Sequence, residues 1–253
     1  VMSMKKFVLG ACAAALMSTA LSGAALARDL LRVGTEPTFA PFEFLDTETK
    51  QFAGFDMDLI RAVADKAGYD VEILNMGFDA LIPALMTRSI DVIAAGLSIT
   101  EERAKRVDFT KPYYTAGLSM LVRKADAQKY PDFKALENQR IAVQIGTTGA
   151  DTAKDIKGAK VAAFNTTSEA FMDLATGNSA AVVHDRPVLA YFLKTQTKSA
   201  GTMQLQPEIL DAQSYGFAVR KGNKELLDKL NKAYDELVAS GEVQKIHDKW
   251  FAQ

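Results

Sequence analysis

Short apolar segments alternate with amphipathic ones along this chain, and no other sequence feature constrains the fold as strongly. In the first half the segments expected as strands or helices are 30–35, 55–67, 70–76, 78–87, 91–94 and 107–109. Apolar residues in 55–67 recur at helical spacing, and Gly68 is placed to end that helix. This repeated strand–helix order predicts an α/β fold in which helices cover a parallel sheet.

The pattern restarts after residues 111–117, which indicates a second structural block. Its expected segments are 118–123, 133–136, 140–143, 150–156, 161–164, 168–176, 181–183, 187–195 and 203–206. The last expected strand, 217–219, and the helices 224–239 and 242–250 have no sheet of their own in this block. We therefore expect the chain to return to the first block. This predicts two lobes, with two hinge crossings near 114–118 and 213–216 and a ligand cleft between the lobes.

The N-terminus has the three parts of a secretory signal peptide. Lys5 and Lys6 form a basic region, an apolar run follows from Phe7, and the sequence Ala-Leu-Ala ends at Ala27. We expect cleavage near Ala27, so residues 1–27 are left out of the fold. The predicted lobes are then 28–115 with 215–253, and 116–214. No later run is apolar and long enough to span a bilayer, so the pattern predicts a soluble exported protein.

Composition excludes several classes of function for the exported part of the chain. The only cysteine, Cys12, lies in the signal peptide, so no disulfide is expected. Without Lys5 and Lys6 the chain has 28 basic and 31 acidic residues, a balance that argues against nucleic-acid partners. The two histidines, His184 and His247, lack metal-ligand spacing, and no metal or other cofactor is expected.

One stretch, from Ala94 to Arg103, combines groups that can bind a carboxylate. It reads as a strand end, a glycine turn at Gly96, hydroxyl residues and a helix start. Ser98 and Glu101 fit a capping box, and Thr100 is an alternative N-cap. Arg103 would lie in the first helical turn, where a cation is unfavourable unless an anion lies nearby. The alternative is a surface arginine that pairs with a neighbouring glutamate, and an isolated motif of this kind favours that alternative.

Polar or aromatic residues also follow the other expected strands, where the carboxyl ends of parallel strands meet. They are Glu36, Phe39, Phe78, Gln144, Thr148, His184 and Asp185. Each has an ordinary structural alternative. The two phenylalanines fit a core, the loop 146–149 fits a simple turn, and Asp185 fits an N-cap. His184 has no identifiable partner for catalysis.

These residues lie in stretches that resemble the periplasmic polar amino-acid-binding proteins of ABC importers, most closely those that bind glutamine. The resemblance covers essentially the whole chain after residue 27. It is strongest at residues 40–44, 54–59, 82–85, 95–103, 107–110, 112–114 and 184–187. It implies a type II periplasmic-binding fold of two hinged lobes.

The resemblance also implies a role for each site residue. Arg103 would bind the ligand carboxylate, helped by the amides of Ser98 and Thr148. Asp185 and the Gly96 carbonyl would accept the ligand ammonium group, helped by the Ser98 hydroxyl. The remaining residues would surround the side chain of the ligand. Phe39 and Phe78 would flank it, Glu36 and Gln144 would line its distal end, and His184 would lie near the contact between the lobes.

Two positions depart from the glutamine-binding pattern and leave the ligand open. Glu36 stands where that pattern has aspartate, and Gln144 where it has lysine. The loss of a lysine disfavours a glutamate ligand and tolerates either a neutral amide or a basic side chain. Because His184 and Asp185 are retained, the sequence favours glutamine, with arginine, lysine or histidine as the alternative.

The resemblance implies a monomeric transport protein that delivers its L-amino acid to the membrane permease of an ABC importer in the periplasm. It is not expected to be an enzyme. A cyclohexadienyl dehydratase-like enzyme on the same fold is the alternative, with Glu36 as the candidate general acid. A receptor domain is disfavoured by the lack of a later membrane segment.

Overall fold

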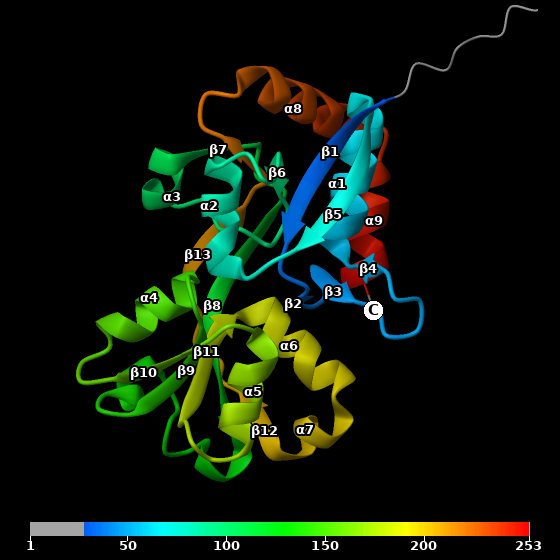
Figure 1. Ribbon diagram of the computed structural model, residues 1–253. Helices are drawn as coiled ribbons and strands as arrows, with labels where there is room; N and C mark the ends of the chain where they lie inside the picture. The colour runs from blue at the N-terminus through cyan, green and yellow to red at the C-terminus, as the bar shows by residue number, and fades with distance from the viewer. Residues whose placement is uncertain (1–27, 253) are drawn as a thin grey trace, which may run out of the picture.

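The computed structural model describes residues 28–252, so the predicted signal peptide and Cys12 lie outside the described residues. Two α/β lobes are joined by two long strands, as the alternating sequence pattern predicts (Figure 1). The two-lobe fold is confirmed, while the exact lobe boundaries at 115/116 and 214/215 stay predictions.

The first sheet has the strand order β5-β1-β6-β14-β7. Its strands are β1 (Asp29–Thr35), β5 (Tyr69–Asn75), β6 (Val92–Ile93), β7 (Val107–Phe109) and β14 (Ala218–Arg220). β1 pairs in parallel with β5 and β6, as predicted. The expectation of a wholly parallel sheet is wrong at β14, which is antiparallel to β6 and β7. β14 enters directly from a hinge strand without a crossover helix, so it can run in the opposite direction.

The second sheet has the order β10-β9-β11-β8-β12, and β13 pairs with another part of β8. Its strands are β8 (Tyr114–Arg123), β9 (Arg140–Gln144), β10 (Lys160–Phe164), β11 (Ala181–Asp185), β12 (Met203–Leu205) and β13 (Leu210–Tyr215). The centre β10-β9-β11 is parallel, and β8 is antiparallel to its neighbours. A small third sheet, β2 (Thr38–Phe39), β3 (Glu43–Leu45) and β4 (Phe52–Ala53), belongs to the first lobe.

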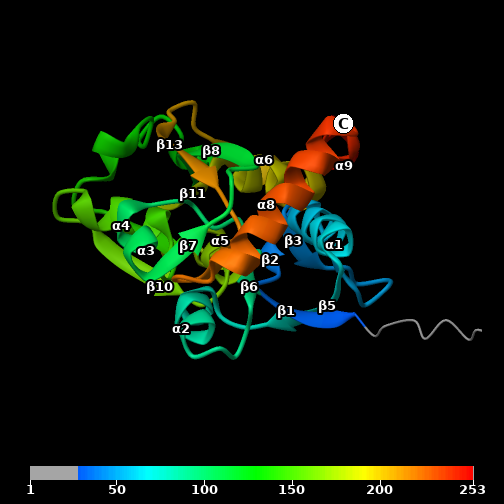
Figure 2. The same cartoon turned by 90° about the horizontal axis from the view of Figure 1, so that it is seen from above.

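Helices cover both sheets. Those of the first lobe are α1 (Phe55–Ala67), α2 (Leu81–Met86), α3 (Glu101–Arg106), α8 (Lys224–Ala239) and α9 (Glu242–Phe251), with a 3-10 turn at Phe78–Ala80. Those of the second lobe are α4 (Thr148–Asp155), α5 (Thr167–Ala175), α6 (Arg186–Thr195) and α7 (Thr197–Thr202), with 3-10 turns at Lys124–Asp126 and Phe133–Leu136. α8 and α9 pack on α1, so the C-terminal helices cover the first lobe (Figure 2).

Two glycines set the ends of α1. Gly54 precedes the helix at φ 125°, and a Cβ there would lie 2.1 Å from the Phe42 carbonyl oxygen. Gly68 ends the helix in the left-handed conformation, as predicted. The apolar face between them is fully buried, which fixes α1 against the first sheet.

The two predicted hinge crossings are neighbouring antiparallel strands. Tyr114 pairs with Tyr215 and Thr115 with Ser214, so the ends of β8 and β13 form a ribbon between the lobes. Strand β8 begins at Tyr114 and strand β13 ends at Tyr215, so both crossings have extended backbone. A two-stranded ribbon can bend as a unit, and such hinges permit lobe opening and closure.

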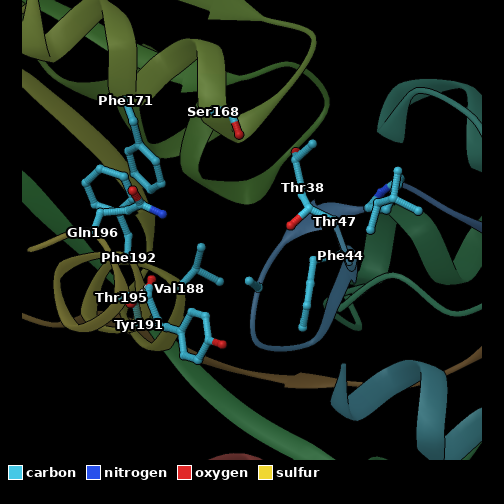
Figure 3. A pocket seen from close by; sticks show the side chains of 13 residues that line it. Thr38, Phe44, Thr47, Ser168, Phe171, Val188, Tyr191, Phe192, Thr195 and Gln196 are labelled. Atoms are coloured by element: carbon cyan, nitrogen blue, oxygen red, sulfur yellow. Dashed lines mark hydrogen bonds between the residues drawn. The ribbon is translucent and has the colours of Figure 1, made fainter. Parts of the chain in front are cut away.

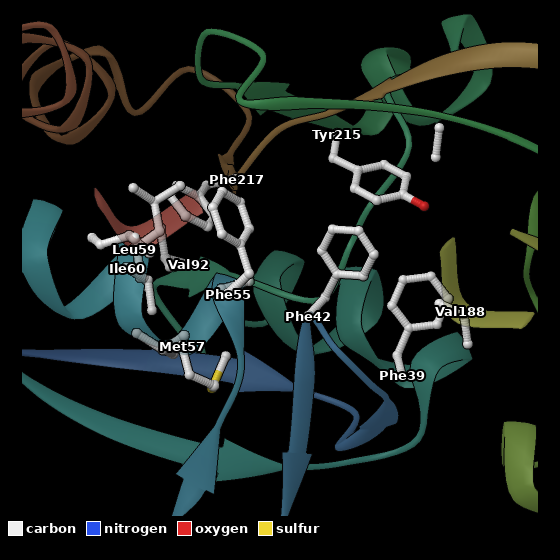
Figure 4. Close-up of a cluster of buried hydrophobic side chains, with 14 of the residues drawn as sticks. Phe39, Phe42, Phe55, Met57, Leu59, Ile60, Val92, Val188, Tyr215 and Phe217 are labelled. Carbon is white, nitrogen blue, oxygen red and sulfur yellow. The ribbon is translucent and has the colours of Figure 1, made fainter. Parts of the chain in front are cut away.

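Aromatic side chains fill the space in front of this ribbon (Figure 4). Phe42 packs edge-on against Tyr215 at a ring-centroid distance of 5.2 Å and against Tyr114 at 4.9 Å. Phe39 extends the cluster toward the second lobe, where it contacts His184 at 5.1 Å. The hydrophobic core therefore continues from the first lobe to the edge of the predicted cleft.

Within residues 28–252, no helix has the length and apolarity needed to cross a membrane. The same part of the chain contains no cluster of three or more His, Cys, Asp or Glu residues that could hold a metal ion.

Candidate functional site

Residues from both lobes converge on one small, nearly closed cavity between them, with about 10 Å³ of free volume. A ligand can therefore enter only when the lobes separate. The lining residues are Phe39, Phe78, Gly96, Ser98, Arg103, Gln144, Thr147, Thr148, His184 and Asp185. Nine of the ten predicted site residues are among them. The tenth, Glu36, does not line the cavity but hydrogen-bonds to Gln144, which does. The structure thus brings the predicted residues together, while their roles toward a ligand stay predictions.

The N-cap of α3 differs from the favoured expectation. Thr100 caps this helix by accepting a hydrogen bond from the Arg103 amide at 3.2 Å. The predicted capping box at Ser98 is therefore wrong, and the alternative N-cap is correct. Thr100 has the extended conformation that an N-cap requires, with φ −123° and ψ 155°. Ser98 is left outside the helix and faces the cavity.

The Arg103 guanidinium reaches across the cleft. Its Nη1 donates to the Ser98 carbonyl at 2.8 Å, and its Nη2 donates to the Gly146 carbonyl of the other lobe at 3.1 Å. The guanidinium carbon lies 5.6 Å from the ring centre of Phe78. Among the described residues, Glu101 and Glu102 form no ion pair with it, so the surface-arginine alternative fails. Burial lowers the pKa of Arg103, and nearby negative charge, first that of Asp185, partly offsets this. A cation held mainly by neutral carbonyls can still take a carboxylate partner.

Asp185 provides a carboxylate at the opposite side of the cavity. Its side chain is 6% exposed, and its Oδ1 accepts a hydrogen bond from the Tyr215 hydroxyl at 2.5 Å. Asp185 occupies the N-cap position of α6, but its side chain makes no capping hydrogen bond. The capping alternative therefore does not explain this aspartate, whose Oδ2 lies 3.1 Å from the His184 ring nitrogen Nδ1.

A hydrogen-bonded network forms the far end of the site. Gln144 Nε2 donates to Glu36 Oε2 at 2.8 Å, and Thr38 Oγ1 donates to the same oxygen at 2.7 Å. Gln144 Oε1 accepts from the Thr167 hydroxyl, which also bonds to His184 Nε2 at 2.9 Å. Burial raises the pKa of the Glu36 carboxyl, and the bonds from Thr38 and Gln144 partly offset that rise. The network joins the Glu36 carboxyl of one lobe to hydrogen-bonding side chains of the other.

Phe39 and Phe78 differ in how they lie between the hydrophobic core and the cleft. Phe39 is 6% exposed and belongs to the core cluster as well as to the cavity wall, so both interpretations hold. A Cβ at Gly96 would lie 2.4 Å from the Phe39 ring, so this position needs glycine. Phe78 is half-buried at the start of its 3-10 turn and lines the cavity.

The loop 146–149 begins α4 and is held by its own hydroxyl group. Thr147 caps α4 by accepting a hydrogen bond from the Ala150 amide at 3.1 Å. A Cβ at Gly149 would lie 2.8 Å from the Val183 carbonyl oxygen, so this glycine allows the helix to pack on β11. The loop thus forms an ordinary helix start that also places Thr148 at the cavity.

Sequence reasoning missed four residues that build the site. Thr147 follows β9 closely, so the strand-end argument could have found it. Thr167 and Tyr215 lie in segments read as a helix start and a hinge, and Asp56 lies in a helix. These three act through partners distant in sequence, and no local pattern indicates such contacts.

A separate groove of about 520 Å³ lies between the β2–β3 segment and helices α5 and α6 (Figure 3). Its wall includes Phe44, Phe171, Tyr191 and Phe192 but no charged side chain. A charged amino acid needs charged or hydrogen-bonding partners when it is buried. The small cavity with Arg103 and Asp185 therefore fits such a ligand better, despite its size.

Comparison with known proteins places this architecture in a family. Residues 31–253 match the family model of bacterial extracellular solute-binding proteins, family 3. The chain is 34% identical over 255 residues to ABC transporter arginine-binding protein 1 of Escherichia coli strain K12, with 99% of this chain and 100% of the relative covered. It is 31% identical over 256 residues to the histidine-binding periplasmic protein of the same strain, with 98% and 97% covered.

Solved structures of amino-acid-binding proteins have a similar fold. An ancestral arginine-binding protein bound to arginine superposes with a TM-score of 0.82 at 45% identity, covering 88% of this chain and 99% of that one. The same type of ancestral protein bound to glutamine gives a TM-score of 0.81 at 42% identity, covering 89% and 99%. The relatives are transport binding proteins rather than enzymes. This chain belongs to the bacterial extracellular solute-binding proteins of family 3.

Proposed function

We propose that this protein binds a basic L-amino acid, with L-arginine preferred, and delivers it to the membrane permease of an ABC importer. It would act outside the cytoplasmic membrane after cleavage of the signal peptide near Ala27, as a monomer. The proposal revises the preference for glutamine that the sequence alone supports.

The α-amino and α-carboxylate groups of any amino acid would bind to opposite walls of the cavity. Arg103 would pair with the carboxylate, and the Ser98 and Thr148 amides would donate to it. Asp185 and the Gly96 carbonyl would accept the ammonium group. Since Arg103 and Asp185 come from different lobes, a bound zwitterion would hold the lobes together and favour the closed state.

The single observation that carries the preference for a cationic side chain is the environment of Glu36. This side chain is 4% exposed, and its described hydrogen-bond partners, Thr38 and Gln144, are both neutral. A buried carboxylate without a cation is costly, so it either takes up a proton or pairs with a positive ligand. A guanidinium group offers the charge and the two parallel N–H groups that a carboxylate prefers. The arginine- and histidine-binding relatives support the same choice.

Glutamine is the second candidate, and one contact favours it. The Gln144 side chain at the distal end has an amide oxygen that can accept a second hydrogen bond beside the one from Thr167, and an ancestral arginine-binding protein has been solved with glutamine bound. A neutral ligand would leave the Glu36 charge uncompensated, so we expect glutamine to bind more weakly than arginine.

Isothermal titration calorimetry across the twenty L-amino acids tests the proposal. We expect arginine to bind most tightly, followed by other basic amino acids and then by glutamine. Tighter binding of glutamine would return the assignment to the glutamine-binding class. Binding of none of the twenty would refute the proposed function.

A further inference from the structure

Asp56 is a fully buried carboxylate that lies behind the ligand cavity without lining it. It occupies the first turn of α1 and is 0% exposed. Its Oδ2 accepts two hydrogen bonds, from the Gly96 amide at 2.8 Å and from the Tyr113 hydroxyl at 2.5 Å. One carboxylate oxygen therefore joins the backbone at the cavity wall to the residue that precedes hinge strand β8.

A second set of hydrogen bonds continues from the hinge to the other lobe. The Tyr113 amide donates to the Tyr215 carbonyl at 3.0 Å. The Tyr215 hydroxyl donates to Asp185 Oδ1, and the Tyr215 side chain is 0% exposed. Figure 4 shows the Tyr215 ring beside Phe42, with its hydroxyl directed away from the first-lobe core.

Taken together, these bonds form one continuous path with the hinge in the middle. It runs from Gly96 through Asp56, Tyr113 and Tyr215 to Asp185. Its two ends are the two groups proposed to receive the ligand ammonium, one on each lobe. The Arg103 end of the cavity is not part of this path.

We propose that Asp56 and Tyr215 are positioning residues for the ligand ammonium group, acting through Gly96 and Asp185 and coupling both to the hinge. This inference rests on the proposed function, because it requires an α-amino acid as the ligand. Gly96 has φ 52° and no side chain, so its orientation depends on the bonds that its peptide groups make. Asp56 supplies the bond to the Gly96 amide. The Tyr215 hydroxyl holds Oδ1 of Asp185, and Oδ2 lies 3.1 Å from the His184 ring nitrogen Nδ1.

If Asp56 and Tyr215 had a purely structural role, their substitution would change the ligand affinities in a different way. If these groups only stabilise the fold or the hinge, their loss weakens every ligand in the same proportion. If they position the ammonium site, their loss weakens only ligands that carry an α-ammonium group. An α-deamino analogue therefore separates the two roles.

The experiment compares L-arginine with 5-guanidinopentanoate, which is arginine without its α-amino group. Both are titrated by calorimetry into the wild type and into Tyr215→Phe, a change that removes one hydroxyl and keeps the buried ring. We expect about tenfold weaker binding of L-arginine, because a hydrogen bond to a charged group is lost. We expect 5-guanidinopentanoate to change less than about twofold.

Two further variants complete the test. Asp56→Ala, which removes the acceptor of the Gly96 and Tyr113 hydrogen bonds, should show the same selective loss, so the conclusion does not depend on one variant folding well; thermal melting checks each fold. Tyr114→Phe is the matched control, because Tyr114 also lies in the hinge and only burial shifts its pKa, with no hydrogen-bond partner contributing. It should leave both affinities unchanged.

Three results have distinct meanings. Equal losses for both ligands in Tyr215→Phe and Asp56→Ala, or no loss of arginine binding, overturn the inference while the proposed function stands. If the wild type prefers another L-amino acid, that amino acid and its deamino analogue replace the pair, and the same selective loss supports the inference. If the wild type binds no amino acid, both the proposed function and the inference fail.

Discussion

Glu36→Gln isolates the charge at the distal end of the site, because the substitution keeps the shape of the side chain. Glu36 Oε2 accepts from Thr38 at 2.7 Å and from Gln144 at 2.8 Å, and a glutamine carbonyl oxygen can accept the same two bonds. The fold and the network should therefore survive. What disappears is the negative charge that would pair with a guanidinium group.

The size of the effect follows from the burial of this carboxylate. Breaking a buried ion pair costs about 3–5 kcal/mol. Since an amide oxygen still accepts a hydrogen bond from the ligand, we take the lower end, about 3 kcal/mol, which corresponds to roughly 100-fold weaker arginine binding. A glutamine ligand loses only one charge-assisted hydrogen bond, so we expect a change of about fivefold or less.

Calorimetric titration of both ligands into the wild type and Glu36→Gln measures this difference. Asp185→Asn is the matched control: it alters a buried carboxylate at the ammonium end, so it should weaken both ligands by the same factor. Equal losses for arginine and glutamine in Glu36→Gln would refute the assignment of Glu36 to the ligand side chain.

Three further predictions concern the two ends of the site and the buried carboxylate behind it. Arg103→Lys should weaken every amino acid about 100-fold in calorimetry, since an ammonium group cannot form the two parallel bonds of a guanidinium; unchanged affinity would remove Arg103 from the carboxylate site. Gln144→Lys should place a cation beside Glu36 and weaken arginine by at least about tenfold while leaving glutamine nearly unchanged, and improved arginine binding would contradict this. Burial raises the pKa of Asp56 to about 7, so the folded protein holds a proton that the unfolded chain releases. The free energy of unfolding should therefore fall as pH rises from about 4 to 7, by at most about 1.4 kcal/mol per pH unit. In urea titrations at several pH values, Asp56→Asn should make this dependence of the unfolding free energy on pH less steep. The same dependence in the variant and the wild type would show that Asp56 does not titrate in this range.

Local pattern was enough to predict most of the elements and the convergence of the site. The apolar periodicity of 55–67 and the glycine after it predicted α1 to within one residue. The carboxyl ends of β1, β6, β9 and β11 face the same cleft, so residues that follow these strands meet there.

The structure differs from the sequence-based predictions where a contact depends on the other lobe, or where two neighbouring residues could both take the same structural role. Ser98 and Thr100 both fit an N-cap, and only the backbone conformation decides between them. The antiparallel direction of β14 depends on how the chain returns through the hinge. Glu36 and Gln144 are 108 residues apart and lie in different lobes, so their hydrogen bond could not be read from either segment.

The choice of ligand was limited for the same reason. Glu36 and Gln144 are predicted from the sequence as the positions that decide the ligand, and the retained His184 and Asp185 are what favours glutamine there. In the structure they share one hydrogen bond, so the buried Glu36 carboxyl has a neutral amide, that of Gln144, as its partner in the other lobe. This pairing is the reason for proposing a basic amino acid rather than glutamine as the ligand.

The central claim is that a buried carboxylate at the distal end selects a positive charge on the ligand. Comparison of L-arginine with L-citrulline tests it most directly, because the two amino acids have nearly the same shape and differ in that charge. Calorimetry with the wild-type protein at pH 7 should show arginine binding at least about 100-fold more tightly than citrulline. Equal affinity for the two, or tighter binding of citrulline, would contradict the account.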